Sequence, residues 1–88
     1  MADRLGMDVA AGEQLARSFT EEARKIGETI NTINSKLSAT WWEGQDSRKF
    51  KADWDTHRNN LNKVKSELEA AGTSVKRQVD QQRSTSNA

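Results

Sequence analysis

The tetrapeptide Trp41-Trp42-Glu43-Gly44 stands near the middle of this 88-residue chain and separates two long periodic segments. Gly44 is the one residue of the four that adopts a positive φ without steric strain. The chain contains no proline, the commonest helix breaker, so each flanking segment can form one uninterrupted helix. We therefore expect the chain to reverse its direction at this tetrapeptide.

Large apolar residues precede the turn at steps of three and four residues. Such spacing places a single apolar stripe along an α-helix and does not fit a β-strand. Asp8 is a suitable N-cap, so the first helix is expected to span residues 8–40. The stripe consists of Leu15, Phe19, Ala23, Ile26, Ile30, Ile33, Leu37 and Trp41.

A second stripe with the same spacing follows the turn and predicts a helix over residues 45–80. It consists of Phe50, Trp54, His57, Leu61, Val64, Leu68, Ala71 and Val75. Residues 81–88 are polar and carry no large apolar side chain, which predicts a disordered tail. Residues 1–7 are expected to form a flexible N-terminal arm, and residues 8–80 an all-α, two-helix antiparallel hairpin.

The two stripes also predict a register, because facing residues have numbers that add to about 87 if the chain folds back sharply at the turn. Trp41 is expected in the core by its spacing from Leu37, and His57 is expected to lie half-buried opposite Ile30. The predicted facing pairs are Leu37–Phe50, Ile33–Trp54, Ile26–Leu61, Ala23–Val64 and Phe19–Leu68.

The composition predicts that this hairpin needs a partner. Hydrophobic residues make up only 33% of the chain and charged residues 31%, so a lone pair of long helices has a thin core. Pairing with a second hairpin into a four-helix bundle is the simplest way to cover the stripes. The residues expected in the hairpin or dimer interface are Leu15, Phe19, Ile26, Ile30, Ile33, Leu37, Leu61, Val64, Leu68 and Val75.

Several functional classes do not fit the composition. The net charge of +1 provides no basic stripe for nucleic acid. With no cysteine and one histidine, we expect no metal site and no cofactor. A two-helix rod offers no pocket for acid–base catalysis, so we expect no enzyme. We expect no cleaved signal peptide, since the first residues lack an apolar segment, and the narrow stripes do not favour membrane binding.

Trp42-Glu43-Gly44, Phe50 and Trp54 together carry a resemblance to a known family. They read W-x-G-x5-F-x3-W at the predicted turn of a small two-helix chain. In this respect the chain resembles the WXG (ESAT-like) family of proteins that type VII (ESX) secretion systems export, over about residues 8–80.

The resemblance implies a fold and a function. Members of that family are helical hairpins that pair antiparallel, as homodimers or as heterodimers with a paralogue. They are synthesised in the cytoplasm and secreted without a cleaved leader, as substrates or co-substrates of the secretion ATPase. Carried onto this chain, Trp42 and Gly44 form the turn motif, in which Trp42 either seals the turn or contacts the exporter.

The export signal of the family, Tyr-xxx-Asp/Glu after the core of the second helix, is degenerate here. Val75 and Val79 fall where the tyrosine and the acid belong, and Asp80 follows one place late. Both valines are interpreted as packing residues. Either the chain leaves the cell with a signal-bearing paralogue, which we favour, or a homodimer uses another tail signal. The alternative function is an intracellular coiled-coil adaptor or regulator that is not exported.

Overall fold

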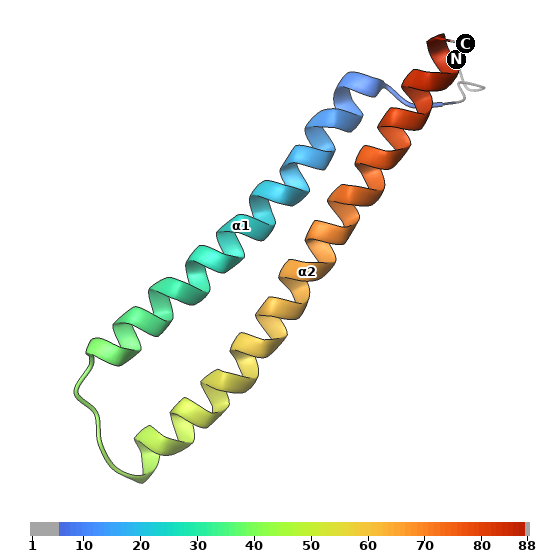
Figure 1. Ribbon diagram of the computed structural model, residues 1–88. Coiled ribbons are helices and arrows are strands. Elements are labelled where there is room, and N and C mark those ends of the chain that lie inside the picture. Colours follow the sequence, from blue (N-terminus) through green and yellow to red (C-terminus); the bar gives the residue numbers. More distant parts are fainter. Residues whose placement is uncertain (1–5, 88) are drawn as a thin grey trace.

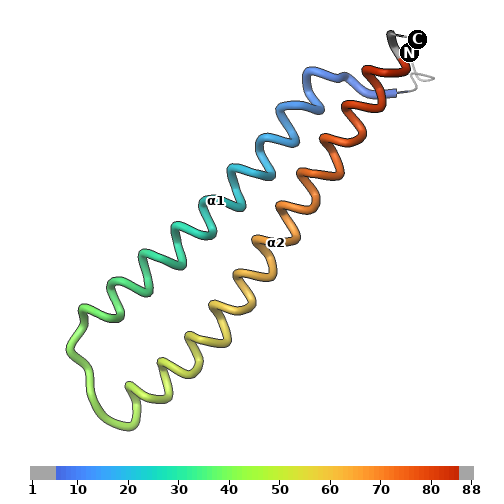
Figure 2. Tube along the Cα trace, viewed as in Figure 1, coloured from blue at the N-terminus to red at the C-terminus, as the bar shows by residue number. Residues whose placement is uncertain are grey.

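The chain folds as two long helices joined by a short loop (Figure 1). In this computed structural model residues 6–87 are described, with side-chain burial through residue 85. Helix α1 spans Val9–Ala39 and helix α2 spans Gln45–Asn87. The tube in Figure 2 follows them side by side and antiparallel. Residues 6–87 contain no strand, so the expected all-α hairpin is confirmed.

Helix α1 begins and ends within one residue of the expected bounds. The Asp8 carboxylate accepts a hydrogen bond from the backbone N–H of Ala11 at 3.1 Å, which satisfies a donor that has no partner inside the helix. At the other end Thr40 has an extended backbone, with φ −86° and ψ 120°. The helix therefore stops before the two tryptophans.

Helix α2 is longer than expected, and the prediction of a disordered tail is wrong over residues 81–87. Gln81, Gln82 and Arg83 are favourable helix formers, and no glycine or proline after Gly72 interrupts the helix. The guanidinium of Arg83 also pairs with the carboxylate of Glu13 on α1. Residue 88 lies outside the described residues.

The predicted N-terminal arm divides into two parts. Residues 1–5 lie outside the described part of the chain. Gly6 and Met7, in contrast, lie against the open end of the hairpin. Gly6 has a φ of +98°, and a Cβ placed on it would come within 3.0 Å of the Gln82 side-chain oxygen. Met7 packs on Gly12 in the first turns of α1.

The hairpin is a rod of 65 × 21 × 19 Å whose two helices meet along one seam. The seam residues are those that recur every three or four positions and are buried or half-buried. On α1 they are Gly12, Ala16, Phe19, Ala23, Ile26, Ile30, Asn34 and Leu37, and on α2 they are Trp54, Arg58, Leu61, Lys65, Leu68, Gly72, Val75, Val79 and Gln82.

The predicted register is wrong by about one helical turn over most of the rod. The numbers of Trp54 and Asn34, which are hydrogen-bonded near the turn, add to 88. Gly27 faces Lys65 and Gly12 faces Val79, and these numbers add to 92 and 91. The difference arises because residues 40–44 do not fold back sharply: Figure 1 shows the loop running on beyond α1 before α2 begins.

Candidate functional site

The turn is held by contacts between its first residues and the start of α2. The hydroxyl of Ser47 donates to the carbonyl oxygen of Trp42 at 2.8 Å, and Ser47 is almost completely buried. Gly44 has a φ of +112°, and its carbonyl oxygen accepts the first helical hydrogen bond of α2, from Arg48, at 3.1 Å. The Trp42–Gly44 segment is therefore a fixed corner.

Aromatic side chains gather at this corner and remain partly open to solvent. The rings of Trp42 and Phe50 lie 5.3 Å apart at an angle of 44°. Phe50 lies in the first turns of α2, and Figure 1 shows these turns projecting past the end of α1. At this level the Phe50 ring packs on Trp42. Trp41 is 84% exposed, and its expected place in the core is wrong because α1 ends before it.

Trp54, the last motif aromatic, faces α1 rather than the tip. Its indole N–H donates to the side-chain oxygen of Asn34 at 2.7 Å across the seam. This bond ties the second helix to the first about three turns from the loop. Trp54 is thus part of the hairpin, whereas Trp42 and Phe50 close its end.

One side of the rod carries exposed apolar side chains among charged ones such as Glu22 and Lys25. Leu15, Ile33 and Val64 each come directly before a seam residue, so they lie to one side of the seam. When two helices are antiparallel, the residues that directly precede seam residues lie on the same side of the rod in both helices. Their side chains are 49%, 37% and 44% exposed. We define the apolar face as Leu15, Ile33, Phe50, His57, Val64 and Ala71, the last four of which recur every seventh residue of α2.

The opposite side of the rod is polar. Residues that come directly after a seam residue lie there, and with the exception of Gly27 all are polar or charged. An interhelical cleft opens on this side between Arg17 and Thr20 of α1 and Thr73 and Lys76 of α2. Representative residues of this polar face are Glu13, Arg17, Thr20, Arg24, Asn62, Ser66, Glu69, Thr73, Lys76 and Asp80.

His57 lies on the apolar face, not in the seam. The position that meets α1 at this level is Arg58, which is half-buried, while His57 is exposed. The expectation of a half-buried histidine opposite Ile30 is therefore wrong, because α2 turns Arg58 rather than His57 toward α1. In the single hairpin His57 meets solvent.

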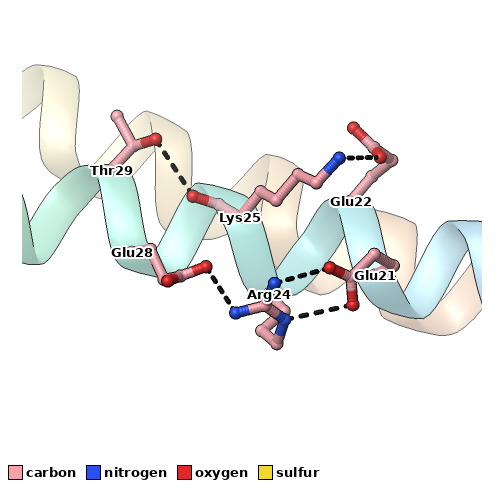
Figure 3. A network of polar contacts seen from close by, with 6 residues as sticks. All are labelled: Glu21, Glu22, Arg24, Lys25, Glu28 and Thr29. Atoms are coloured by element: carbon pink, nitrogen blue, oxygen red, sulfur yellow. Dashed lines mark hydrogen bonds and ion pairs between the residues drawn. The ribbon is translucent and has the colours of Figure 1, made fainter.

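The outer surface of α1 carries a network of ion pairs within the helix (Figure 3). Arg24 lies between Glu21 and Glu28 and pairs with both, and Lys25 pairs with Glu22 at 3.0 Å. The hydrogen bond that Arg24 donates lowers the pKa of the Glu21 carboxyl, and the bond that Lys25 donates to Glu22 raises the pKa of Lys25. These groups are fully exposed, so they support the helix and form no reactive centre.

The residues aligned with the degenerate export signal serve different roles. Val79 is completely buried against α1, and Val75 is half-buried in the seam. Asp80 accepts a hydrogen bond from the Lys76 ammonium at 2.7 Å on the exposed polar face. The two valines are therefore packing residues, as interpreted from their spacing.

Sequence reasoning missed the polar residues that fix the turn and the seam. Ser47 and Asn34 were not singled out, because a hydroxyl or amide between apolar stripes gives no periodic signal. One signal could have identified Asn34: it lies four residues after Ile30 and three before Leu37, a spacing that also fits the seam. Only the observed register shows that Asn34, not Ile33, faces Trp54.

Among the described residues no group of three histidine or acidic side chains is placed to hold a metal ion. Neither α1 nor α2, within those residues, has a stretch apolar enough to cross a bilayer. Comparisons with models of protein families, with curated proteins and with solved structures gave no match for the chain.

Proposed function

We propose that this chain is a non-enzymatic pairing protein, which binds a second helical hairpin through its apolar face to form a four-helix bundle. The supporting observation is the difference between the two sides of the rod. Leu15, Ile33, Phe50 and Val64 are all more than a third exposed on one side. The residues beside the seam on the other side are polar.

The dimensions of the rod suit this proposal. A face about 65 Å long and 21 Å wide has an area on the order of 1,000 Å². That exceeds the ~800 Å² that each partner contributes to a typical stable interface. Half-buried seam residues such as Phe19 and Leu68 would be covered further by the same partner. A second hairpin is an occupant that matches this long, narrow face along its whole length.

We further propose that type VII secretion exports the pair. The support is the resemblance described above: Trp42 and Gly44 form a fixed corner between two antiparallel helices, and Phe50 packs on Trp42. A tip of this kind projects from the end of the rod, where Trp42 is 37% exposed and would contact the secretion ATPase, with the 84% exposed Trp41 beside it.

A heterodimer with a WXG paralogue is the favoured form of the pair, and a homodimer is the alternative. Where the family places its export signal, this chain has Val75 and Val79, and both pack in the hairpin. A paralogue that carries Tyr-xxx-Asp/Glu would supply the missing signal. Co-expression of this chain with such a paralogue, followed by sedimentation of the mixture and of each chain alone, distinguishes the two forms.

Pairing is tested by a charge placed on the apolar face. Val64→Asp should leave the hairpin helical, because Val64 is 44% exposed, but should prevent association by burying an unpaired carboxylate. Asn62→Asp adds the same charge on the polar face two residues away and should leave association unchanged. Sedimentation equilibrium of each variant, mixed with the partner hairpin, measures its association. Equal association of the two variants would contradict the proposal.

Export is tested separately in cells. Deleting the secretion ATPase should retain the chain in the cytoplasm, and restoring the ATPase should return it to the medium. Unchanged extracellular protein after the deletion would reject type VII export. A chain that pairs through its apolar face but is never found outside the cell would support the alternative, an intracellular coiled-coil adaptor.

A further inference from the structure

The open end of the hairpin contains the most completely buried large side chain among the described residues. Val79 of α2 has no exposed surface, although it stands only two turns from the end of its helix. It is covered by Gly12 of α1: a Cβ placed on Gly12 would come within 2.9 Å of a Val79 methyl group. The absence of a side chain at Gly12 therefore allows this close approach.

Met7 covers the same place from the other side. Its sulfur lies in the space that a Cβ on Gly12 would occupy. The missing side chain of Gly12 therefore makes room for both Met7 and Val79. Met7 is nevertheless 36% exposed, counted over the whole residue. Met7 thus closes the open end with an apolar residue that is partly open to solvent.

The last two turns of α2 depend on this closure. Residues 80–87 carry no large apolar side chain, so they gain nothing from burial of their own. Two contacts tie them to the rest of the hairpin: Gln82 lies against Gly6, and Arg83 pairs with Glu13. Gly6 is the immediate neighbour of Met7, so the first contact requires Met7 to stay docked.

We propose that Met7 is an oxidation site that controls the order of the end of α2. The oxidant is a peroxide, with hydrogen peroxide as the simplest case. The sulfur lone pair attacks one peroxide oxygen, so that an S–O bond forms as the O–O bond breaks, and the departing hydroxide takes the proton of the sulfur-bound hydroxyl and becomes water. Met7 is oxidised to the sulfoxide and the peroxide is reduced.

The sulfoxide disfavours the docked position for two reasons. Its oxygen adds volume where Gly12 already leaves only the space that the sulfur fills. Its S–O group is strongly polar and loses hydration when it packs on Gly12. Met7 and Gly6 then leave the open end, Val79 meets water, and the polar turns from Asp80 onwards fray.

The test measures backbone amide exchange before and after hydrogen peroxide treatment, with mass spectrometry to locate the added oxygen. Oxidation at Met7 should accelerate exchange over residues 79–85 about tenfold, which corresponds to ~1.4 kcal/mol. Exchange near Trp54, at the other end of the rod, should not change. Treatment with methionine sulfoxide reductase should restore the original rates.

Two variants decide whether Met7 is responsible. Met7→Leu keeps an apolar side chain without sulfur and retains Met1, so peroxide should leave its exchange over residues 79–85 unchanged. Gly12→Ala should displace both the Met7 sulfur and Val79 and accelerate exchange there without any oxidant, so it reports the closure as a whole, while Met7→Leu isolates the sulfur. Oxidation of Met7 with no change in exchange, or an equal peroxide effect in Met7→Leu, would overturn the proposal. Neither measurement depends on pairing or export.

Discussion

One hydrogen bond crosses the seam between the two helices near the turn. The indole N–H of Trp54 donates to Asn34, and both side chains are half-buried between α1 and α2. A polar pair in a largely apolar seam is satisfied in one register only, so it disfavours slipped pairings of the helices. The bond therefore specifies the register more than it adds stability.

Removing the acceptor should reveal this bond in equilibrium unfolding. Asn34→Ala leaves the Trp54 donor without its partner in the seam, and we expect the free energy of unfolding to fall by about 1 kcal/mol. Urea denaturation of Asn34→Ala, Trp54→Phe and the double variant measures the coupling between the two residues. Strictly additive losses would show that the bond contributes nothing.

The ion pairs of α1 make a second prediction at the scale of single residues. Hydrogen bonding to Arg24 lowers the pKa of Glu21, so the folded state favours the carboxylate. This contribution to stability is complete at neutral pH and is lost as the pH falls below the ordinary value of 4.5 and through the lowered pKa of the folded state. It is small and sensitive to salt, because the pair is fully exposed.

Glu21→Gln tests the sign of this pH dependence. The variant should unfold slightly more easily than the parent chain at neutral pH and low salt. The difference should shrink when the pH is lowered through the carboxylate range, because the parent then loses its charge as well. Thermal unfolding followed by circular dichroism at a series of pH values measures it. A difference that grows in acid would contradict the assignment.

At the scale of the elements, the hairpin contains two glycines with opposite requirements. Gly44 has a φ of +112° in the turn, with no atom within 4 Å of a Cβ placed on it. Gly27 lies within α1, where a Cβ would come within 3.1 Å of Cε in the flexible Lys65 side chain. The first needs glycine for its backbone, whereas the second does not.

Alanine at these two positions should therefore change stability in opposite directions. Gly44→Ala forces a non-glycine residue into a positive φ and should cost ~1–2 kcal/mol. Gly27→Ala improves helix propensity, Lys65 can move aside, and we expect a gain of ~0.5–1 kcal/mol. Chemical denaturation of both variants provides the comparison. Equal effects would show that the turn tolerates another conformation.

The elements could be predicted from the sequence because apolar spacing and capping are local. Asp8 as N-cap, the break at Trp42–Gly44 and both helices follow from such signals. The register could not be predicted, because it depends on the path of the loop: residues 40–44 extend along the axis instead of folding back sharply. Separately, each helix is rotated slightly about its own axis relative to the predicted stripes, which places Val64 and Ile33 beside the seam and His57 at the surface.

The end of α2 shows a second limit of sequence reasoning. The composition of residues 81–87 is typical of a disordered tail, but composition does not include contacts with distant parts of the chain. Glu13 and Gly6 meet this segment from the N-terminal end of the sequence. Their contributions become visible only when the fold has brought the two ends together.

The whole molecule is a thin rod whose two sides differ in chemistry. In a single hairpin, each helix can cover only the seam residues of the other, and the side chains next to the seam stay open. Those side chains are polar on one side and include Leu15, Ile33 and Val64 on the other. A partner hairpin on the apolar face would leave charged surface outside and would place His57 inside the interface.

The shape of the assembly follows from the position of the apolar face along the rod, and small-angle scattering can measure it. The single hairpin has a Cα radius of gyration of 19.8 Å. Two rods packed side by side about 10 Å apart double the mass but raise the radius of gyration only to about 20–21 Å. Rods joined through their aromatic tips would instead give a value near 40 Å, about twice that of one hairpin, because the length doubles.

We expect the pair to have the side-by-side radius of gyration. Val64→Asp should have nearly the same radius of gyration as the pair but half its mass. A pair with the larger radius would move the interface from the apolar face to the Trp41–Trp42 tip.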